Sequence, residues 1–192
     1  MKLIAITGGI GSGKSVVSRL LEVMGYEVYD CDSRAKSLML NDPVVRQQLI
    51  EAFGKNTYLD DGSINRSHLS TVAFTDATAL SRLNAIVHPA TATDLIGWAH
   101  GQAAAGASRA FVETALLRTA GLDRIVDDVW HVTAPDPVRT VRVMARSGLT
   151  AAQVEQRMAA QRDEDYINDG EQVLVNDGVT ALLPQVMELL KN

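Results

Sequence analysis

The sequence predicts an α/β fold, with a parallel sheet flanked by helices. Two observations predict it: five short apolar runs alternate with segments of helical spacing, and a glycine-rich segment joins the first run to the first helix. Strands of a parallel sheet are buried on both faces, so they read as continuous apolar runs. The five runs are Leu3–Ile6, Glu27–Tyr29, Ala110–Val112, Val129–Val132 and Val173–Val175.

The first crossover is predicted to contain a helix over residues 14–24. Val17, Leu20, Leu21 and Met24 fall on one face of it, as in a helix that packs on a sheet. Gly25 is well placed to end the helix, because glycine readily adopts the left-handed conformation common after the last turn. Strand, helix and strand in this order indicate parallel strands joined by right-handed crossovers.

Two connections are longer than a simple crossover needs, and the first runs from about residue 33 to residue 108. Pro43 is predicted to open a helix that Gly54 closes. The pair His88-Pro89 is predicted to break the chain before a further helix, because proline disfavours the helical conformation of the residue before it. This connection therefore reads as a helical insertion.

The second long connection covers residues 136–168. A helix is predicted to open at Asp136 and to be interrupted at Gly148. Thr150 and Gln153 have the spacing of a capping box, which starts another helix. The sequence thus predicts a core domain with two helical insertions, divided as residues 1–32, 109–135 and 169–192 for the core, 33–108 for the first insertion and 136–168 for the second.

Bulk composition excludes some classes of function. The net charge of −5 provides no basic field for nucleic acid or an anionic membrane surface. Cys31 is the only cysteine, so no internal disulfide forms and a reducing compartment is favoured. The apolar start at residues 1–6 is too short for a signal peptide or a membrane span, so a cytoplasmic location is expected.

Residues 8–15 read GGIGSGKS and fit the Walker A pattern G-x-x-x-x-G-K-[ST]. Such a loop turns its backbone N–H groups toward phosphate oxygens, in conformations that glycine tolerates. The helix that starts near Gly13 adds its N-terminal dipole. Lys14 is expected to reach the β- and γ-phosphates, and the hydroxyl of Ser15 to bind Mg²⁺. The residues expected to hold ATP are Gly9, Gly11, Ser12, Gly13, Lys14, Ser15 and Val16.

A nucleotide site does not define a reaction, and the remaining motifs favour a small-molecule kinase over a GTPase. The only D-x-x-G lies at Asp94–Gly97, inside a helical insertion, and none of the five lysines lies in an [NT]KxD motif. An ATPase motor usually needs a longer chain. A nucleotide-binding regulatory protein with little turnover remains the alternative from another class.

Two acidic residues follow predicted strands, where ligands of open α/β sheets are bound. Asp32 is a candidate general base for an acceptor hydroxyl. The alternative is that Asp32 or Ser33 only caps the next helix. Glu113 is a candidate Walker B carboxylate that supports Mg²⁺, and its alternative is an ordinary charge at a strand end.

The second insertion carries several arginines. Arg139, Arg142 and Arg146 fall at i, i+3 and i+7, so they share one helical face. Arg157 and Arg162 follow in the next predicted helix. An arginine-bearing helical insertion is typical of a lid that closes over ATP. The alternative is a solvated charged face, but next to a Walker A motif we expect at least one of these arginines to reach phosphate.

Together these segments resemble the dephospho-CoA kinase family over nearly the whole chain. The similarity rests on residues 6–15 (ITGGIGSGKS), 25–32 (GYEVYDCD), 61–66 (DGSINR), 83–89 (LNAIVHP), 142–146 (RVMAR), 157–161 (RMAAQ) and 176–178 (NDG). Three positions depart from the family pattern. Cys31 replaces an alanine, Asn65 stands where an aspartate is frequent, and Thr119 stands where many members have a glutamate.

The resemblance implies a reaction and a set of roles. The family moves the γ-phosphoryl group of ATP to the 3′-hydroxyl of dephospho-CoA, the last step of coenzyme A synthesis, and its sheet has the order 2-3-1-4-5. By resemblance, Asp32 is the base, residues 33–108 hold dephospho-CoA, and residues 136–168 are the lid. The expected catalytic residues are Asp32, Lys14 and Arg142. Further expected contacts are Arg66 and His88 with the acceptor, and Arg142, Arg146 and Asn176 with ATP. We expect no nucleic-acid or membrane partner, and a monomer or weak homo-oligomer.

Overall fold

The computed structural model describes residues 1–75 and 77–191 of the chain. The chain divides into two compact units. The core unit comprises Met1–Tyr29 and Gly101–Asn192, and the helical unit comprises Asp30–His100. Each unit has its own hydrophobic core, as expected for compact substructures.

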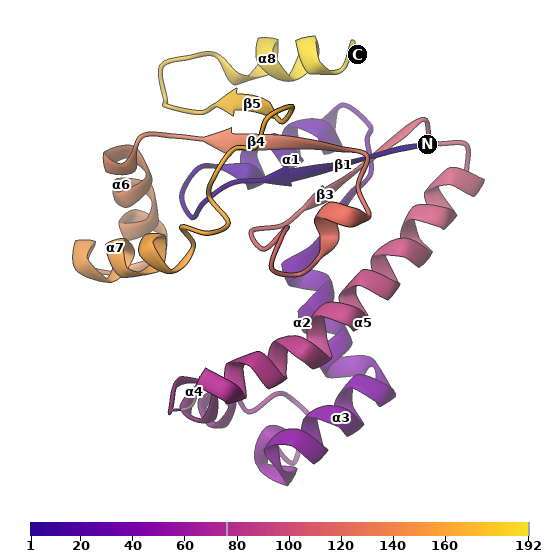
Figure 1. Ribbon diagram of the computed structural model, residues 1–192, viewed down its shortest axis with the longest axis vertical. Coiled ribbons are helices and arrows are strands. Elements are labelled where there is room, and N and C mark those ends of the chain that lie inside the picture. The colour runs from indigo at the N-terminus through magenta and orange to yellow at the C-terminus, as the bar shows by residue number, and fades with distance from the viewer. Residues whose placement is uncertain (76, 192) are drawn as a thin grey trace. The chain divides into compact units, whose positions relative to one another are not determined.

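A five-stranded sheet of order β2-β3-β1-β4-β5 forms the centre of the core unit, which confirms the expected order 2-3-1-4-5 (Figure 1). The central strand β1 pairs in parallel with both β3 and β4, and β4 pairs in parallel with β5. All five predicted strands are present: β1, β3 and β4 are one residue longer at each end, β5 starts one residue earlier, and β2 is shifted by one residue along the chain. The strands are β1 (Lys2–Thr7), β2 (Val28–Asp30), β3 (Arg109–Glu113), β4 (Asp128–Thr133) and β5 (Gln172–Val175).

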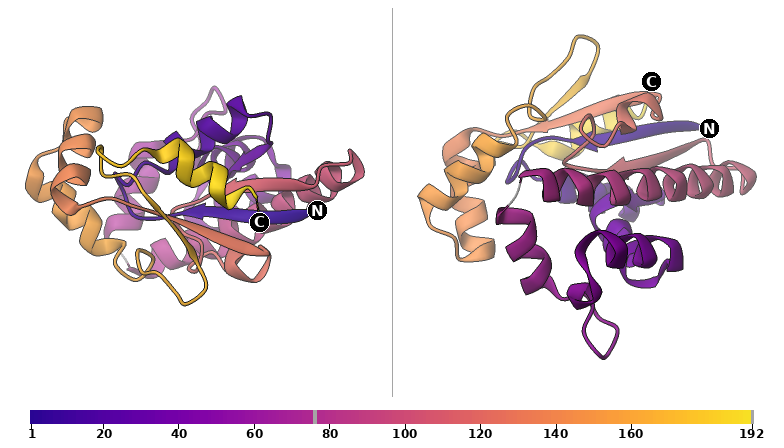
Figure 2. Two further views of the ribbon diagram at one scale, coloured as in Figure 1. Left: turned by 90° about the horizontal axis from the view of Figure 1, so that it is seen from above. Right: turned by 60° about the horizontal axis from the view of Figure 1, so that its bottom comes forward.

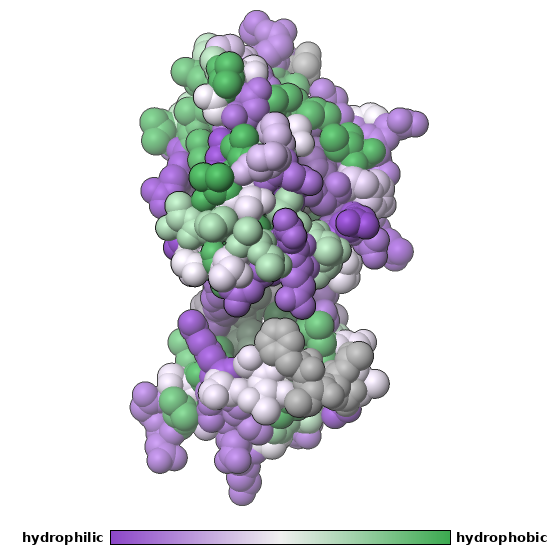
Figure 3. All heavy atoms as spheres, turned by 90° about the vertical axis from the view of Figure 1, so that its left-hand side faces the viewer, coloured by the Kyte–Doolittle hydropathy of each residue, from purple (hydrophilic) through white to green (hydrophobic). Residues whose placement is uncertain are grey.

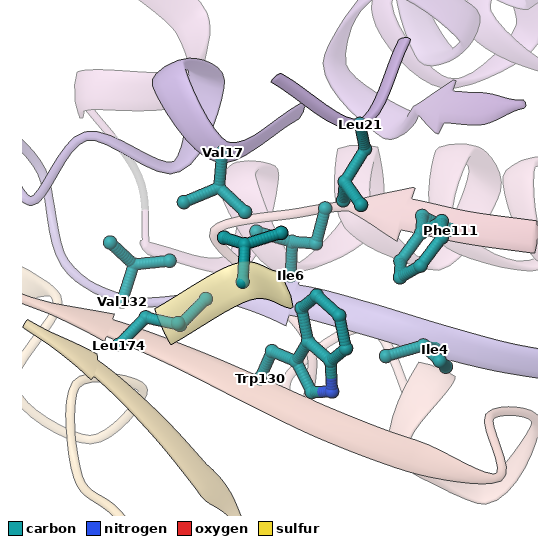
Figure 4. Packing of buried hydrophobic residues seen from close by; sticks show 9 residues of the cluster. Ile4, Ile6, Val17, Leu21, Phe111, Trp130, Val132 and Leu174 are labelled. Carbon is teal, nitrogen blue, oxygen red and sulfur yellow. The ribbon is translucent and has the colours of Figure 1, made fainter. Parts of the chain in front are cut away.

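Helix α1 (Lys14–Val23) and helix α8 (Leu182–Leu189) pack with the sheet around the core of this unit. Figure 4 shows Val17 and Leu21 of α1 pointing toward the side chains of the strands. Trp130 of β4 lies in the middle of this cluster and its ring centroid is 5.1 Å from that of Phe111. The predicted apolar face of the first helix is buried at Val17 and Leu21, but Met24, predicted on the same face, follows the last helical residue and is 40% exposed. In Figure 2, α8 (yellow) runs alongside the strands.

Helices α6 (Asp136–Ser147) and α7 (Ala151–Ala160) pack against each other after β4 (Figure 1). Gly148 ends α6 in the left-handed conformation, with φ of 67°. The predicted capping box is confirmed: the Thr150 side chain accepts from the Gln153 amide, and the Gln153 side chain accepts from the Thr150 amide. A short 3₁₀ helix, η2 (Leu122–Arg124), precedes β4.

The helical unit contains α2 (Cys31–Asn41), α3 (Pro43–Phe53), the 3₁₀ helix η1 (Lys55–Thr57), α4 (Arg66–Thr75) and the first part of α5 (Ala77–Ala104). Helix α3 has the predicted limits. Asp42 caps it by accepting from the amides of Val44 and Val45, Pro43 stands in its first turn, and Gly54 follows its last residue. The core of this unit is Val45, Leu49, Phe53, Leu69 and Ala79.

The prediction of a break at His88-Pro89 is wrong, because α5 continues through Pro89. A proline inside a helix removes one backbone hydrogen bond and costs about 3 kcal/mol. Val87 before the proline and Leu95 after it are both buried. Packing on both sides therefore outweighs the local preference of the His88-Pro89 pair.

In the part of the chain that the structure describes, no helix has both the length and the apolar character needed to cross a membrane. On the face of the molecule drawn in Figure 3, hydrophobic and hydrophilic residues are interspersed.

Candidate active site

The Walker A loop, residues 8–15 and here called the P-loop, follows β1 and ends in α1, as predicted. Its glycines are required by close contacts as well as by backbone conformation. Gly13 has φ of 97°, and a Cβ atom there would lie 2.0 Å from Nδ2 of Asn176. Gly11 has φ of 81°, and a Cβ atom there would lie 2.7 Å from the carbonyl oxygen of Arg139. No side chain fits at either position.

Three successive carbonyl oxygens of the P-loop accept hydrogen bonds from side chains of distant segments. Nε of Arg139 donates to the Ile10 oxygen at 2.9 Å. Nδ2 of Asn176 donates to the Ser12 oxygen at 2.8 Å. Nη1 of Arg142 lies 3.4 Å from the Gly11 oxygen and donates to the Asn176 oxygen at 2.8 Å. These bonds occupy the carbonyl groups of Ile10, Gly11 and Ser12 with donors from outside the loop.

The amides of Gly11, Gly13 and Ser15 have no hydrogen-bond acceptor among the described residues. Helix α1 also starts without a side-chain cap. Orphan amides at a helix N-terminus form a ready anion site, because the N–H groups and the helix dipole both favour negative charge. Nζ of Lys14 lies in the same loop, 2.8 Å from the Gly8 oxygen. The geometry therefore fits the phosphates of a nucleotide.

The start of the P-loop is held by a segment that sequence reasoning did not assign to the site. The Asp165 carboxylate accepts from the Gly9 amide at 2.7 Å and pairs with Nη1 of Arg139 at 2.6 Å. Oε1 of Gln161 accepts from the Ile10 amide at 2.8 Å. The only sequence signal was the position of Gln161 in a motif of the similar family. Asp165 lies four residues further on, where a helical turn brings it to the same side.

Burial of Asp165 alone would raise the pKa of its carboxyl group. Hydrogen bonds from His131, Arg139 and the Gly9 amide outweigh this desolvation, so the pKa lies below its ordinary value. The carboxylate is thus charged throughout the neutral range. Its charge offsets that of Arg139, whose side chain is only 8% exposed.

His131 extends this buried polar cluster toward the loop after β3. Its Nε2 is 3.3 Å from Asp165 and its Nδ1 is 3.5 Å from Glu171. Arg118 pairs with Glu171, and Glu164 accepts from the Arg118 amide. His131 thus lies inside β4 between two acidic side chains of the segment after α7. Glu164 also binds the Thr119 amide, at the position where many family members carry a glutamate.

In the helical unit, Asp30 is the N-cap of α2, and not Asp32 or Ser33. Oδ1 of Asp30 accepts from the amides of Asp32 and Ser33 at 3.0 and 3.3 Å, and the Ser33 hydroxyl donates to Oδ2 at 2.5 Å. The alternative that Asp32 serves only as a cap is therefore wrong. The Asp32 carboxylate is exposed in the first turn of α2 and makes no hydrogen bond or ion pair with the residues that the structure describes.

The other predicted site residues are more scattered. Glu113 ends β3, where the strand register places it beside Ile6 of β1, close in sequence to the P-loop. Arg66 starts α4 and lines a cavity of the helical unit. His88 is half-buried on α5. Arg146 is exposed in the last turn of α6 and forms no hydrogen bond with the P-loop, unlike Arg139 and Arg142 on the same helix.

For a metal ion, the P-loop offers the hydroxyl of Ser15, exposed in the first turn of α1, and the nearby strand end offers Glu113. Oxygen ligands of this kind suit Mg²⁺, which keeps several waters and also binds substrate phosphates. The described residues contain no group of three acidic, histidine or cysteine side chains able to hold a metal alone.

A parallel sheet of order 2-3-1-4-5, with a phosphate-binding loop between its central strand and the first helix, defines a P-loop kinase-like protein. The family model for dephospho-CoA kinase matches residues 2–181. The chain therefore belongs to the dephospho-CoA kinase family.

Relatives and solved structures agree with this assignment. Dephospho-CoA kinase of Porphyromonas gingivalis is 38% identical over 193 residues, which cover 100% of this chain and 94% of the relative. Dephospho-CoA kinase of Geobacter sulfurreducens is 38% identical over 190 residues, with coverage of 98% and 96%. The crystal structure of TT1252 from Thermus thermophilus has a TM-score of 0.78 at 32% identity, covering 99% of this chain and 94% of its own. Dephospho-CoA kinase from Campylobacter jejuni shares the fold, with a TM-score of 0.71 at 20% identity and coverage of 100% and 95%.

Proposed function

We propose that this chain transfers the γ-phosphoryl group of ATP to the ribose 3′-hydroxyl of dephospho-CoA, giving coenzyme A and ADP. Family membership over residues 2–181 supports the acceptor and the reaction. The observation that carries the proposal is the P-loop, whose Gly11, Gly13 and Ser15 amides have no acceptor among the described residues, since a phosphate-rich donor is the ligand that such a loop fits.

In this proposal the P-loop amides bind the β- and γ-phosphates, and Lys14 offsets the charge that builds up on the transferring group. Arg142 is held at the loop by its bonds to the Gly11 and Asn176 oxygens, and it shares this electrostatic role. Mg²⁺, held by Ser15 with support from Glu113, supplies further charge neutralisation when bound. Proximity and electrostatics are the main contributions that phosphoryl transfer needs from a protein.

Asp32 is proposed as the base that orients the acceptor hydroxyl and accepts its proton. Its carboxylate is available for this task because Asp30 performs the capping of α2. An exposed, uncommitted carboxylate in the first turn of a helix can take up a hydroxyl group of a ligand without first breaking an internal contact.

Residues 33–108 are proposed to hold dephospho-CoA, with Arg66 and His88 among the contacts, and residues 136–168 to act as the lid. Arg146, exposed in the last turn of α6, is proposed to contact ATP when the lid closes. The reaction is proposed to take place in the cytoplasm, with the enzyme a monomer or weak homo-oligomer.

The proposal is tested by incubating the purified protein with Mg²⁺-ATP and dephospho-CoA and detecting coenzyme A and ADP by mass spectrometry. AMP, gluconate and shikimate serve as parallel acceptors. Conversion of dephospho-CoA alone is the expected result. ADP formed only with another acceptor would overturn the acceptor assignment, and ATP binding without turnover on any acceptor would favour a regulatory protein.

A matched pair of variants tests the base. Asp32→Asn is expected to lower kcat by about 10²-fold or more, because it removes proton acceptance and leaves the shape unchanged. Asp60→Asn, an exposed aspartate of the same unit, is the control and is expected to leave kcat unchanged. A kcat of Asp32→Asn equal to that of the control would remove Asp32 from the mechanism.

A further inference from the structure

A bidentate ion pair ties the amino-terminal part of α2, which carries the proposed base Asp32, to α5 within the helical unit (Figure 1). Nε of Arg34 donates to Oδ2 of Asp94 at 2.8 Å, and Nη2 of Arg34 donates to Oδ1 at 2.7 Å. Two parallel bonds between a guanidinium and a carboxylate fix the relative orientation of the two groups as well as their distance. The pair therefore defines how the start of α2 lies on α5.

The two ends of α2 are held by different contacts. At the carboxyl end, the Tyr58 hydroxyl donates to the Met39 oxygen at 2.6 Å. Nη1 of Arg46 donates to the Leu40 oxygen at 2.7 Å. At the amino end, the cap from Asp30 joins residues that are neighbours in the sequence, so it fixes the local turn and not the place of the helix in the unit. The ion pair with α5 supplies a tertiary contact at this end.

Side chains do not fill the space between α2, α3 and α5. A cavity of about 440 Å³ lies there, and its lining includes Leu38 of α2, Pro89 of α5 and Asp94 itself. A void removes the dispersion contacts by which close packing fixes a helix. Leu95, the neighbour of Asp94, is buried, so the carboxylate extends from a well-packed part of α5. The ion pair thus supplies a constraint that packing lacks along this stretch of α2.

The proposed base and the arginine of the pair use different faces of α2. Asp32 and Arg34 are two residues apart, and residues at this spacing do not face each other on a helix. Arg34 therefore contacts α5 from one face while the Asp32 carboxylate stays exposed on another. Any change in the place of α2 on α5 moves Asp32 with the helix. A misplacement of a reacting group by about 1 Å can lower a rate by about 10²-fold.

We propose that Arg34 and Asp94 are positioning residues for the reaction: their ion pair holds the start of α2 so that Asp32 meets the acceptor hydroxyl in a productive geometry. This inference rests on the proposed function, because it takes Asp32 as the base. Arg34 and Asp94 act through the backbone of α2. Their side chains are 47% and 22% exposed, and pairs of this exposure contribute little to stability, so the effect on the rate is separable from an effect on folding.

The inference is tested by the single-turnover rate of phosphoryl transfer to dephospho-CoA at saturating Mg²⁺-ATP and acceptor. Arg34→Gln and Asp94→Asn are each expected to lower this rate about tenfold and to leave the Kd for ATP unchanged. The double variant is expected to lower the rate no further, because either single change breaks the same pair. Asp94→Asn keeps the charge of Arg34, so its rate loss cannot come from a missing cation near Asp32.

Lys2→Gln is the matched control. The ion pair of Lys2 with Asp128 has similar exposure, 40% and 21%, and it lies at the start of β1, at the edge of the sheet opposite to the P-loop. Its rate is expected to equal that of the wild type. In an Asp32→Asn background, Arg34→Gln is expected to have no further effect, because the base that it positions is absent. Circular dichroism checks that every variant is folded.

Each other outcome has a definite meaning. Rates of Arg34→Gln and Asp94→Asn that match Lys2→Gln would overturn the positioning role and leave the proposed function intact. A loss for Arg34→Gln alone would overturn it too, because the arginine would then act through its own charge. An equal loss in the Asp32→Asn background would show that the pair supports the fold and not the base. Absence of turnover in the wild type would reject the proposed function, and the positioning role with it.

Discussion

Replacing Asp165 with asparagine should destabilise the core unit strongly, because it removes the buried charge that faces Arg139. The carboxylate is 16% exposed and accepts from the Gly9 amide, Arg139 and His131 at 2.7, 2.6 and 3.3 Å. Asparagine retains the shape and one acceptor oxygen but leaves the charge of Arg139 without its buried partner. Removing one partner from a buried ion pair costs about 3–5 kcal/mol, and we expect about 3 kcal/mol because one hydrogen bond is kept.

The assay is equilibrium unfolding in urea at neutral pH, followed by circular dichroism, with Asp163→Asn as the matched control. Asp163 is exposed and two residues away, so its variant should lie within about 0.5 kcal/mol of the wild type. A loss of less than about 1 kcal/mol for Asp165→Asn would refute the reasoning, because the Asp165 carboxylate would then not be the main compensation for Arg139.

The same pair of proteins gives a pH test with a defined sign. The pKa of Asp165 is lower in the folded chain than in the unfolded chain. Its charge therefore adds stability that is complete above the unfolded value of about 3.9 and is lost as the pH falls through the folded value. Between neutral pH and the acid range below about pH 4, the wild type should lose more stability than Asp165→Asn. Parallel acid profiles would contradict the assigned ionisation.

Two further outcomes concern the nucleotide site and the core. Gly13→Ala should abolish measurable ATP binding, because a Cβ atom would lie 2.0 Å from Asn176 and the φ of 97° disfavours any side chain; a Kd for ATP near that of the wild type, by calorimetry, would show that the loop tolerates the change. Trp130→Ala should lower the free energy of unfolding by about 3–5 kcal/mol, because Trp130 is 1% exposed and packs against Phe111. In urea unfolding, a loss below about 1.5 kcal/mol would mean that the cluster repacks around the cavity.

The sequence by itself determined the features that depend on neighbouring residues. Strands are recognisable as apolar runs because they are buried on both faces. The P-loop is recognisable as a motif because its glycines, Lys14 and Ser15 lie close together in the sequence. The cap of α3 at Asp42 and Pro43 and the capping box at Thr150 are local for the same reason. Family motifs added the sheet order, which periodicity alone leaves open.

Local patterns were misleading where packing or a competing group prevailed. The pair His88-Pro89 has the signature of a break, yet α5 continues because buried residues on both sides hold it in one helix. Asp32 has the position and residue type of a cap, yet Asp30 takes that role two residues earlier and leaves Asp32 uncommitted. In both places two local conformations have equally good sequence signals. The structure adopts the one of lower free energy in the whole fold.

Only the tertiary structure decided which distant side chains complete the P-loop. Asp165 lies 156 positions from Gly9 along the chain, and Asn176 lies 164 positions from Ser12. Asp165 has no local pattern that distinguishes it from a solvated polar side chain, and the family motif that contains Asn176 implied a contact with ATP and not the bond to the Ser12 oxygen. They contact the loop because β1 and β4 are parallel neighbours, so that the chain leaving β4 starts at the same edge of the sheet as the P-loop. Hydrogen bonds and ion pairs depend on distance in space and not on separation along the sequence.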